Sequence, residues 1–379
     1  MKLRLLSVFV FLQSGIGMAQ VANSNSYDDE KKGINIADLV EMSGDWFIAY
    51  RDGIKQIQAD ENVPVINEHT SSFVLKRSYF TLKKDLNAIF SVRYTMDLTI
   101  DTEGDDAGNV ETRLKYLYLM TKPKLNSKVL TGTAIEVGMV HRPWLDYEQK
   151  MNTYRVQDNM FIERNRIFNS ADFGLTVTGN IGPKMDEEFL KSVNGVMKGK
   201  YASYSLGIYN GGGYSGIENN NNKVIAGRLT LRPFANTLPQ LQISGYFNRG
   251  KGNSEFSPDF NQVLGFLAFT EKQFKITAQL HDGVGDFRAR YVDPVDPSRA
   301  LDNHGYSFFG EYKFGNSPFS LWGRFDEFKV EEIEERTQRV IGGLTYRANK
   351  MIRLILNTEH TTVDDNTEDT YELNLEISF

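Results

Sequence analysis

The sequence contains no cysteine, which excludes a disulfide framework, a thiolate zinc site and a cysteine nucleophile. Its five histidines show no spacing typical of metal ligands, so we expect neither a metal nor a cofactor; they are His69, His141, His281, His304 and His360. Acidic residues outnumber basic ones by 49 to 43, a formal charge of -6, which argues against a nucleic-acid partner. Beyond residue 19 no apolar run is long enough to form a transmembrane helix.

The first 19 residues have the three-part order of a secretory signal peptide. Lys2 and Arg4 precede an apolar run at 5–12, and small residues follow. Because a membrane span needs about twenty apolar residues, this run predicts export by the Sec route and cleavage before Gln20. The alternative is a buried amino-terminal helix. Removing 1–19 leaves 41 basic residues against 49 acidic ones, a formal charge of -8.

The last ten residues alternate between apolar and polar side chains. One face of an extended strand would carry Tyr371, Leu373, Leu375, Ile377 and Phe379, and the other face would carry polar residues. Outer-membrane barrels end in this way, with the apolar face toward lipid and the polar face toward a water-filled lumen. By resemblance to other outer-membrane proteins, we expect Tyr371 and Phe379 to act as the signal that the barrel-assembly machinery reads.

The same period of two recurs along the chain in segments of about ten residues, the length of a tilted transmembrane strand. We predict sixteen strands, at 46–52, 71–82, 88–100, 112–121, 128–141, 171–181, 200–209, 223–233, 241–249, 261–270, 274–281, 304–314, 318–328, 337–347, 351–360 and 370–379. The last strand must pair with the first to remove the free edges of the sheet. The fold class is therefore an all-β transmembrane antiparallel barrel over 46–379, and the polar stretch 20–45 predicts a flexible periplasmic lead-in.

Short connections alternate with long ones along the chain. Connections such as 83–87 and 315–317 are short, whereas 142–170 and 282–303 are long and polar. Outer-membrane barrels have short periplasmic turns and long external loops, so the alternation also predicts the orientation. One connection breaks the rule, because 182–199 is long although it lies at the barrel end where the other connections are short. We expect a small amphipathic helix there, at the periplasmic rim.

Several segments resemble the phosphate-selective porin O and P family of outer-membrane proteins. The resemblance is carried by residues 137–144, 161–164, 172–174, 204–212 and 227–234. It implies a sixteen-stranded porin, usually a homotrimer, whose third loop folds into the lumen, with solutes that include phosphate. The chain shows no counterpart of the arginine ladder and lysine cluster of that family, so the resemblance does not extend to phosphate selectivity.

The connection 142–170 would be this third loop. Its mixed charges are Arg142, Asp146, Glu148, Lys150, Arg155, Asp158, Glu163, Arg164 and Arg166. If the loop folds inward, the residues that we expect at the pore constriction are Arg142, Arg155, Glu163, Arg164 and Arg166. Charges at the narrowest point create the transverse field that sorts solutes. The alternative is a solvated external loop.

The alternation also assigns charged residues to the inner face of the wall. The basic ones are Arg228, Arg232, Lys275, Lys313, Arg324, Arg339, Arg347 and Arg353, and the acidic ones are Glu136, Glu311, Asp326, Glu359, Glu372 and Glu376. Eight against six predicts a pore that is mixed or weakly anion-preferring. Guanidinium groups hold anions bidentately, which makes Arg228, Arg232 and Arg353 the first candidates. The alternative is an ion-pair network that only maintains the shape of the barrel.

These observations predict a porin of the bacterial outer membrane, embedded in lipid, through which small anionic or neutral solutes diffuse passively. Two other classes stay open. One is a structural or uptake-complex barrel without an open pore. The other is a lipid hydrolase on the outer wall, but only His141 is expected to point outward near a strand end, and no serine is paired with it by spacing. We therefore do not expect an enzyme.

Overall fold

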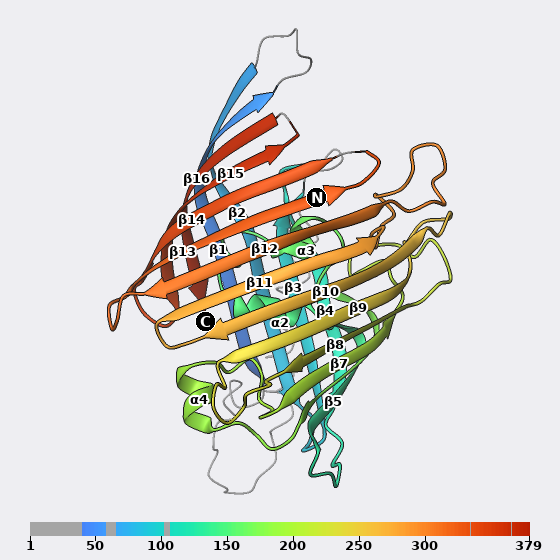
Figure 1. Cartoon of the computed structure of the whole chain (residues 1–379), viewed down its shortest axis with the longest axis vertical. Coiled ribbons are helices and arrows are strands. Elements are labelled where there is room, and N and C mark those ends of the chain that lie inside the picture. Colours follow the sequence, from blue (N-terminus) through green and yellow to red (C-terminus); the bar gives the residue numbers. More distant parts are fainter. Residues whose placement is uncertain (1–39, 58–65, 102–106, 334, 365) are drawn as a thin grey trace, which may run out of the picture. The chain divides into compact units, whose positions relative to one another are not determined.

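Sixteen antiparallel strands form one closed barrel, in which each strand pairs with its neighbours along the chain and β16 pairs with β1 (Figure 1). The computed structural model describes residues 40–57, 66–101, 107–333, 335–364 and 366–379, so the expected signal peptide and residues 20–39 of the lead-in lie outside the described residues. The strands are β1 (Glu41–Ile57), β2 (Ile66–Asp85), β3 (Phe90–Ile100), β4 (Val110–Thr121), β5 (Leu130–His141), β6 (Ala171–Ile181), β7 (Ala202–Tyr209), β8 (Val224–Leu231), β9 (Leu241–Lys251), β10 (Asp259–Thr270), β11 (Phe274–Val284), β12 (Asp302–Lys313), β13 (Phe319–Val330), β14 (Arg336–Arg347), β15 (Ile352–Val363) and β16 (Asn366–Ser378). The predicted fold class, the strand number and the closure by the last strand are confirmed.

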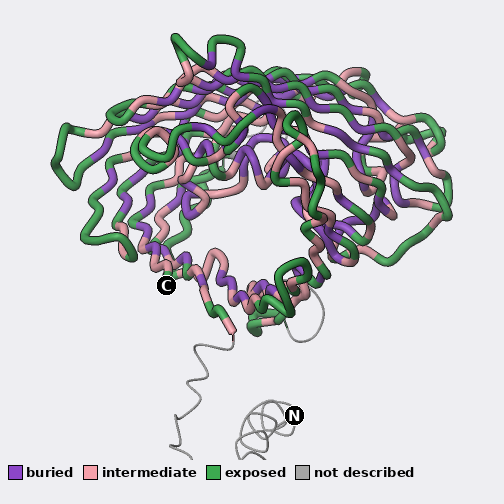
Figure 2. Tube along the Cα trace, turned by 90° about the horizontal axis from the view of Figure 1, so that it is seen from below, coloured by how far each residue is buried: buried purple, intermediate pink, exposed green. Residues whose placement is uncertain are grey.

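Apolar side chains cover the outside of the barrel and polar side chains cover its inside. Strand β9 shows the pattern: Ile243 and Phe247 are exposed, whereas Gln242, Ser244 and Asn248, which alternate with the outward positions, are buried. Figure 2 shows this alternation of exposed and buried positions along the strands, together with chain segments that lie inside the ring. A soluble protein would place its polar residues outside, so the inversion is that of a barrel with lipid around it and water within.

Two hairpins are longer than their sequence pattern predicts. Strand β1 begins at Glu41, five residues before the expected start, and β2 spans 20 residues. The β1–β2 and β15–β16 hairpins extend beyond the neighbouring strands (Figure 1). Residues 66–73 are exposed on both faces, so no apolar alternation marks this part of β2, and the prediction began it at residue 71.

Three short helices lie in the connections on either side of β6. Helices α2 (Leu145–Met151) and α3 (Phe161–Arg164) belong to the β5–β6 connection, and α4 (Glu187–Ser192) belongs to the β6–β7 connection. The Asp186 carboxylate caps α4 by accepting a hydrogen bond from the Phe189 backbone N–H at 3.0 Å. Because strands alternate in direction, α4 lies at the barrel end that carries the short turns, as predicted for this connection. Among the described residues, no helix is both long and apolar enough to cross a membrane.

Candidate functional site

Residues 142–170, here called loop 3, fold into the barrel. Their apolar side chains are fully buried and pack on aromatic rings of the inner wall. The Trp144 ring lies 5.4 Å from that of Phe266 on β10, and the Phe168 ring lies 5.2 Å from that of Tyr246 on β9, centroid to centroid. An external loop would leave these groups in water, so burial of apolar surface drives the loop inward.

Hydrogen bonds join loop 3 to strands on the far side of its attachment. The Tyr154 hydroxyl donates to Glu311 Oε1 on β12 at 2.7 Å, and Gln157 Nε2 donates to Glu359 Oε2 on β15 at 2.7 Å. The guanidinium of Arg164 pairs with the same Glu359 carboxylate. Loop 3 therefore crosses the interior from β5 to β15, and the predicted inward fold is confirmed.

The basic residues expected on the inner wall mostly hold loop 3 in place. Arg228 Nε donates to the Pro143 carbonyl at 3.0 Å and Arg353 Nη2 to the Thr153 carbonyl at 2.7 Å. The others in this group bond in the same way: Arg324 to the Asn159 carbonyl, Arg339 to Asn165 Oδ1 and Lys275 to the Met151 carbonyl. Arg324 and Arg353 also form ion pairs with Asp326 and Glu376. These side chains face inward, but their N–H groups already donate hydrogen bonds to loop 3 or pair with carboxylates of the wall.

Two predicted wall residues lie away from loop 3. Arg232 is 2% exposed, and its guanidinium donates to the main-chain carbonyls of Met197, Gly199, Lys200 and Pro239. It therefore fixes the β6–β7 connection and cannot meet a solute. Arg347 is exposed near the end of β14 that adjoins a short turn.

Arg142 was expected at the constriction, but the structure places it beneath loop 3. Its side chain is fully buried, and its guanidinium carbon lies 4.9 Å from the ring centre of Phe168 and 5.5 Å from that of Tyr209. The Asp172 carboxylate is 3.8 Å away. Cation–π contact and this carboxylate stabilise the charge at the base of the loop, so Arg142 is a structural anchor and the prediction of a pore-lining role is wrong.

Of the other expected loop residues, Arg155, Glu163 and Arg164 are largely buried, and only Arg166 is exposed. Arg155 and Glu163 form an ion pair at 3.1 Å, and Arg164 pairs with Glu359. Arg166 is exposed, with a backbone φ of 57° in the left-handed region. The structure thus brings Arg155 and Glu163 together, whereas the next residue, Arg164, pairs with Glu359 on β15 and Arg166 lies beyond the end of α3.

Two β-bulges place additional cations inside the barrel. Opposite β1, Phe47 pairs with Arg77 and Ile48 pairs with Leu75, so Lys76 is an extra residue. Opposite β3, Thr95 pairs with Tyr116 and Met96 pairs with Leu114, so Lys115 of β4 is an extra residue as well. A bulge lets two adjacent residues point to one face, and here Lys76 with Arg77, and Lys115 with Tyr116, all point inward. The sequence analysis missed these residues because a bulge shifts the period of two by one residue.

The hydroxyl of Tyr79 on β2 is the meeting point of three cations. It accepts hydrogen bonds from Lys115 Nζ at 3.1 Å, from Arg77 Nη1 at 3.4 Å and from Arg155 Nη2 at 3.4 Å. We call these four residues the Tyr79 cluster. It joins the β2–β4 wall to loop 3, and its shared acceptor is a phenol oxygen instead of a carboxylate.

Next to this cluster, Arg93 on β3 stacks over the Tyr116 ring at 4.6 Å and lies 3.2 Å from His141 Nε2. The Nδ1 atom of His141 is 2.8 Å from a Glu136 carboxylate oxygen, so His141 points inward and the outward position expected from the sequence is wrong. Among the described residues, Arg77, Arg93 and Lys115 form no ion pair within 4.0 Å. None of the three is in direct contact with a carboxylate, although Glu163 attracts Arg77 and Lys115, and Asp146 attracts Arg93, over a longer distance.

Glu148 of α2 is a buried carboxyl group within loop 3. Burial raises its pKa to about 8, although Trp144 Nε1 donates a hydrogen bond to its Oε2 at 2.9 Å and Arg324 lies nearby. The group is therefore mostly protonated at neutral pH, which spares the interior an unpaired negative charge.

The comparisons agree with this geometry. The barrel has the fold of the outer-membrane porins. An anion-selective porin from Comamonas acidovorans superposes with a TM-score of 0.57 at 10% identity, over 90% of this chain and 99% of that one. OmpF of Salmonella typhi, in a complex with daunomycin, gives 0.55 at 11% identity over 91% and 99%. OprB of Pseudomonas putida gives 0.53 at 10% identity over 91% and 95%.

No family model and no curated protein sequence matches the chain. At identities near 10% the likeness to solved structures is one of fold alone. The resemblance to the phosphate-selective porin O and P family therefore stays a prediction, as does every functional role of the residues above.

Proposed function

We propose that the protein is an outer-membrane porin through which small hydrophilic solutes diffuse, with a preference for anions. The closed barrel, its apolar outer face and its polar inner face support a channel in lipid. Loop 3, folded against β8–β15, supports a narrowed lumen. The same fold and loop arrangement would leave Tyr371 and Phe379 on the outer face, where both are exposed, available to the barrel-assembly machinery during insertion.

The observation that carries the anion preference is a set of cations on β2–β4 that have no carboxylate in direct contact. Arg77, Arg93 and Lys115 stand opposite loop 3, and their nearest polar partners are phenol, hydroxyl or imidazole groups. A cation that no carboxylate contacts directly adds positive potential to a lumen, which raises the local concentration of anions. Phosphate belongs to this class of solute.

We also infer a homotrimer. OmpT of Vibrio cholerae, described in a trimer form, superposes with a TM-score of 0.51 at 8% identity, over 90% of this chain and 100% of that one. The exposed apolar outer face supplies surface both for neighbouring subunits and for outer-membrane lipid. Export through the Sec route would bring the chain to the assembly machinery.

Reversal potentials in planar bilayers under a KCl gradient test the proposal. The variant Arg77→Gln/Arg93→Gln/Lys115→Met removes three lumen charges and keeps side-chain size. The control Lys329→Met/Arg336→Gln removes the half-buried Lys329 of β13 and the exposed Arg336 of β14, which pair with Glu331 and Glu327. We expect the anion-to-cation permeability ratio to exceed one in the wild type and the control and to fall in the triple variant.

An unchanged ratio in the triple variant would remove these cations from the selectivity filter. Wild-type barrels that conduct no current would overturn the porin proposal in favour of a structural or uptake-complex barrel. Lipid turnover in detergent would instead indicate a hydrolase. Replacing chloride by phosphate in the same recordings separates phosphate selectivity from a general preference for anions.

A further inference from the structure

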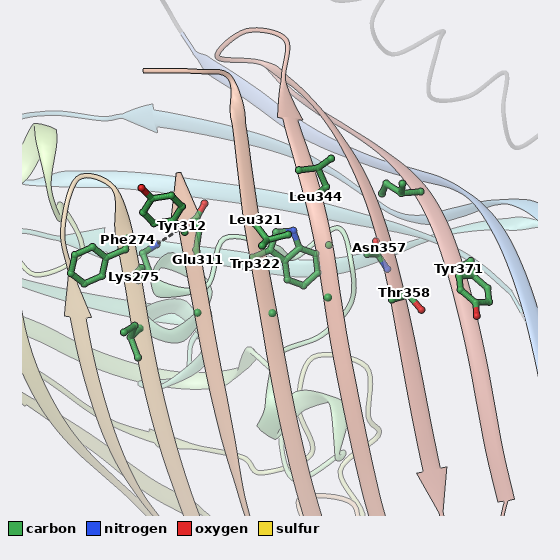
Figure 3. Close-up of a pocket in the computed structure, with 16 residues that line it drawn as sticks. Phe274, Lys275, Glu311, Tyr312, Leu321, Trp322, Leu344, Asn357, Thr358 and Tyr371 are labelled. Atoms are coloured by element: carbon green, nitrogen blue, oxygen red, sulfur yellow. Dashed lines mark ion pairs between the residues drawn. The ribbon is translucent and has the colours of Figure 1, made fainter. Parts of the chain in front are cut away.

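A groove of about 940 Å³ lies on the wall formed by β11–β16 (Figure 3). Its floor is a row of three glycines on adjacent strands, because Gly310 pairs with Gly323 and Gly323 pairs with Gly342. The row continues through Ile276 on one side and Thr358 on the other. The groove therefore crosses the strands at right angles.

These glycines face the outside of the barrel. The residues two positions away from them are exposed, including Tyr312 at 48%, Leu321 at 53% and Val340 at 54%. The residues directly next to them, such as Glu311 and Trp322, are buried toward the interior. The groove thus opens on the same side as the apolar band of the barrel.

No neighbouring side chain covers the floor. A Cβ atom added at Gly310, Gly323 or Gly342 would meet only main-chain oxygens, at 4.0, 3.5 and 3.9 Å. Gly227, on strand β8, provides a contrast, because a Cβ there would lie 2.6 Å from the Phe247 ring and 2.7 Å from Leu206. The depression at the three glycines is open and unfilled by the wall itself.

Rows of large apolar side chains lie on both sides of the glycines. Tyr312, Leu321, Leu344 and Leu356 pair in sequence and line the groove, whereas Phe308, Phe325 and Val340 pair in a row on the other side of the glycines. Each row stands two residues from the glycines, about 7 Å along the strand.

The groove lies nearer to the short-turn end of the strands. Gly323 is four residues from the start of β13, and Gly310 is three residues from the end of β12. Exposed aromatic residues cluster at that end: Phe274, Tyr312, Phe314, Phe319 and Tyr346. Such a girdle marks a membrane interface, and short turns mark the periplasmic side.

We propose that this groove holds an acyl chain of a phospholipid from the periplasmic leaflet. The groove is continuous with the apolar band that faces lipid, so hydrocarbon is the medium that reaches it. Barrel strands tilt by about 45°, so a groove perpendicular to them is tilted by a similar angle from the membrane normal, and a lipid chain can follow it. The Tyr312 ring at the border lies where the glycerol and headgroup of that lipid would begin.

Lipid retention measured by native mass spectrometry tests the proposal. The barrel is purified in mild detergent with added phosphatidylethanolamine, and the fraction with one bound phospholipid is determined. The test variant, Gly323→Leu/Gly342→Leu, fills the groove from outside. The matched control, Gly245→Leu/Gly265→Leu, places leucines at a directly paired pair of outer glycines on β9 and β10, where an added Cβ meets nothing within 4 Å.

We expect the wild type and the control to retain one phospholipid, and the test variant to bind it about tenfold more weakly, because about two methylene groups lose their burial. Equal retention in test variant and control would overturn the proposal. Lipopolysaccharide held in place of phospholipid, or oligomers lost in the test variant alone, would also overturn it, since these outcomes assign the groove to the outer leaflet or to a second copy. If the double variant fails to fold, Gly323→Leu alone against Gly265→Leu gives the same comparison.

Discussion

The ammonium group of Lys115 lies 3.1 Å from the phenol oxygen of Tyr79 and 4.3 Å from the centre of its ring. A lysine that pairs with a carboxylate gives little field beyond the pair. Lys115 is held instead by a phenol oxygen and a π-face, so its position is fixed while its charge still acts on solutes. The bulge in β4 creates this arrangement, because without the extra residue Lys115 and Tyr116 would point to opposite faces.

Neutralising Glu163 is predicted to strengthen the anion preference. This carboxylate pairs with Arg155 of the Tyr79 cluster at 3.1 Å, so Glu163→Gln releases a cation without changing side-chain size. A unit charge at about 4 Å in a water-like medium contributes about 1 kcal/mol, so we expect the permeability ratio to rise by up to about fivefold. Reversal potentials measure it. Glu368→Gln, on the exposed β15–β16 hairpin, is the control, and a lower ratio in Glu163→Gln would contradict the assignment.

Loss of Glu359 is predicted to loosen loop 3. Its carboxylate accepts a hydrogen bond from Gln157 and pairs with Arg164, so Glu359→Ala leaves two buried loop groups without this partner. Removing one member of a buried ion pair costs about 3 kcal/mol. We expect larger and noisier open-state currents in single-channel recordings, and no such change for Glu331→Ala, whose carboxylate is exposed. Currents as quiet as those of the wild type would show that the remaining contacts suffice to hold the loop.

The barrel could be predicted from the sequence because one physical rule acts on every strand. Lipid outside and water inside impose a period of two, which gave the strand number, the closure by β16 and the facing of residues such as Arg228 and Ile225. The inward course of loop 3 also followed, from the family resemblance. The strand ends in the β1–β2 hairpin could not be predicted, because residues on both faces of the hairpin are exposed there and the alternation disappears.

The Tyr79 cluster could not be found in this way. Alternation assigns facing only while the register is regular, and the bulges at Lys76 and Lys115 interrupt it on two of the strands that matter most. The alternation also predicts which way a side chain points, but not which atoms the side chain contacts. Arg324 and Arg353 do point inward, but only the path of loop 3 reveals that they bond to its carbonyls. A pair of adjacent charged or aromatic residues within a strand pattern is the signal that indicates such a bulge.

The packing of loop 3 is predicted to depend on pH through Glu148. Its pKa is raised to about 8 when the loop is packed, against an ordinary value of 4.5 when the loop is displaced. The packed form therefore binds more protons between these values, and its stability falls as pH rises from about 4.5 to about 8, then levels off. We expect open-state current noise to increase over this range. Glu148→Gln, which stays neutral, should abolish the dependence, and an identical pH profile in that variant would assign the effect to another group.

The seam between β1 and β16 is predicted to tolerate no side chain at Gly44. The Gly44 and Phe379 backbones exchange hydrogen bonds of 2.9 and 3.0 Å, and a Cβ at Gly44 would lie 2.6 Å from the Phe379 ring and 2.8 Å from the Tyr79 carbonyl oxygen. Relieving that overlap requires one strand of the seam to move, at a cost of about 1–3 kcal/mol. We expect Gly44→Val to lower the fraction of barrels that migrate as folded in unheated gels. Gly245→Val introduces the same side chain on an outer face with open space, so equal folded fractions for the two variants would show that the seam can absorb the change.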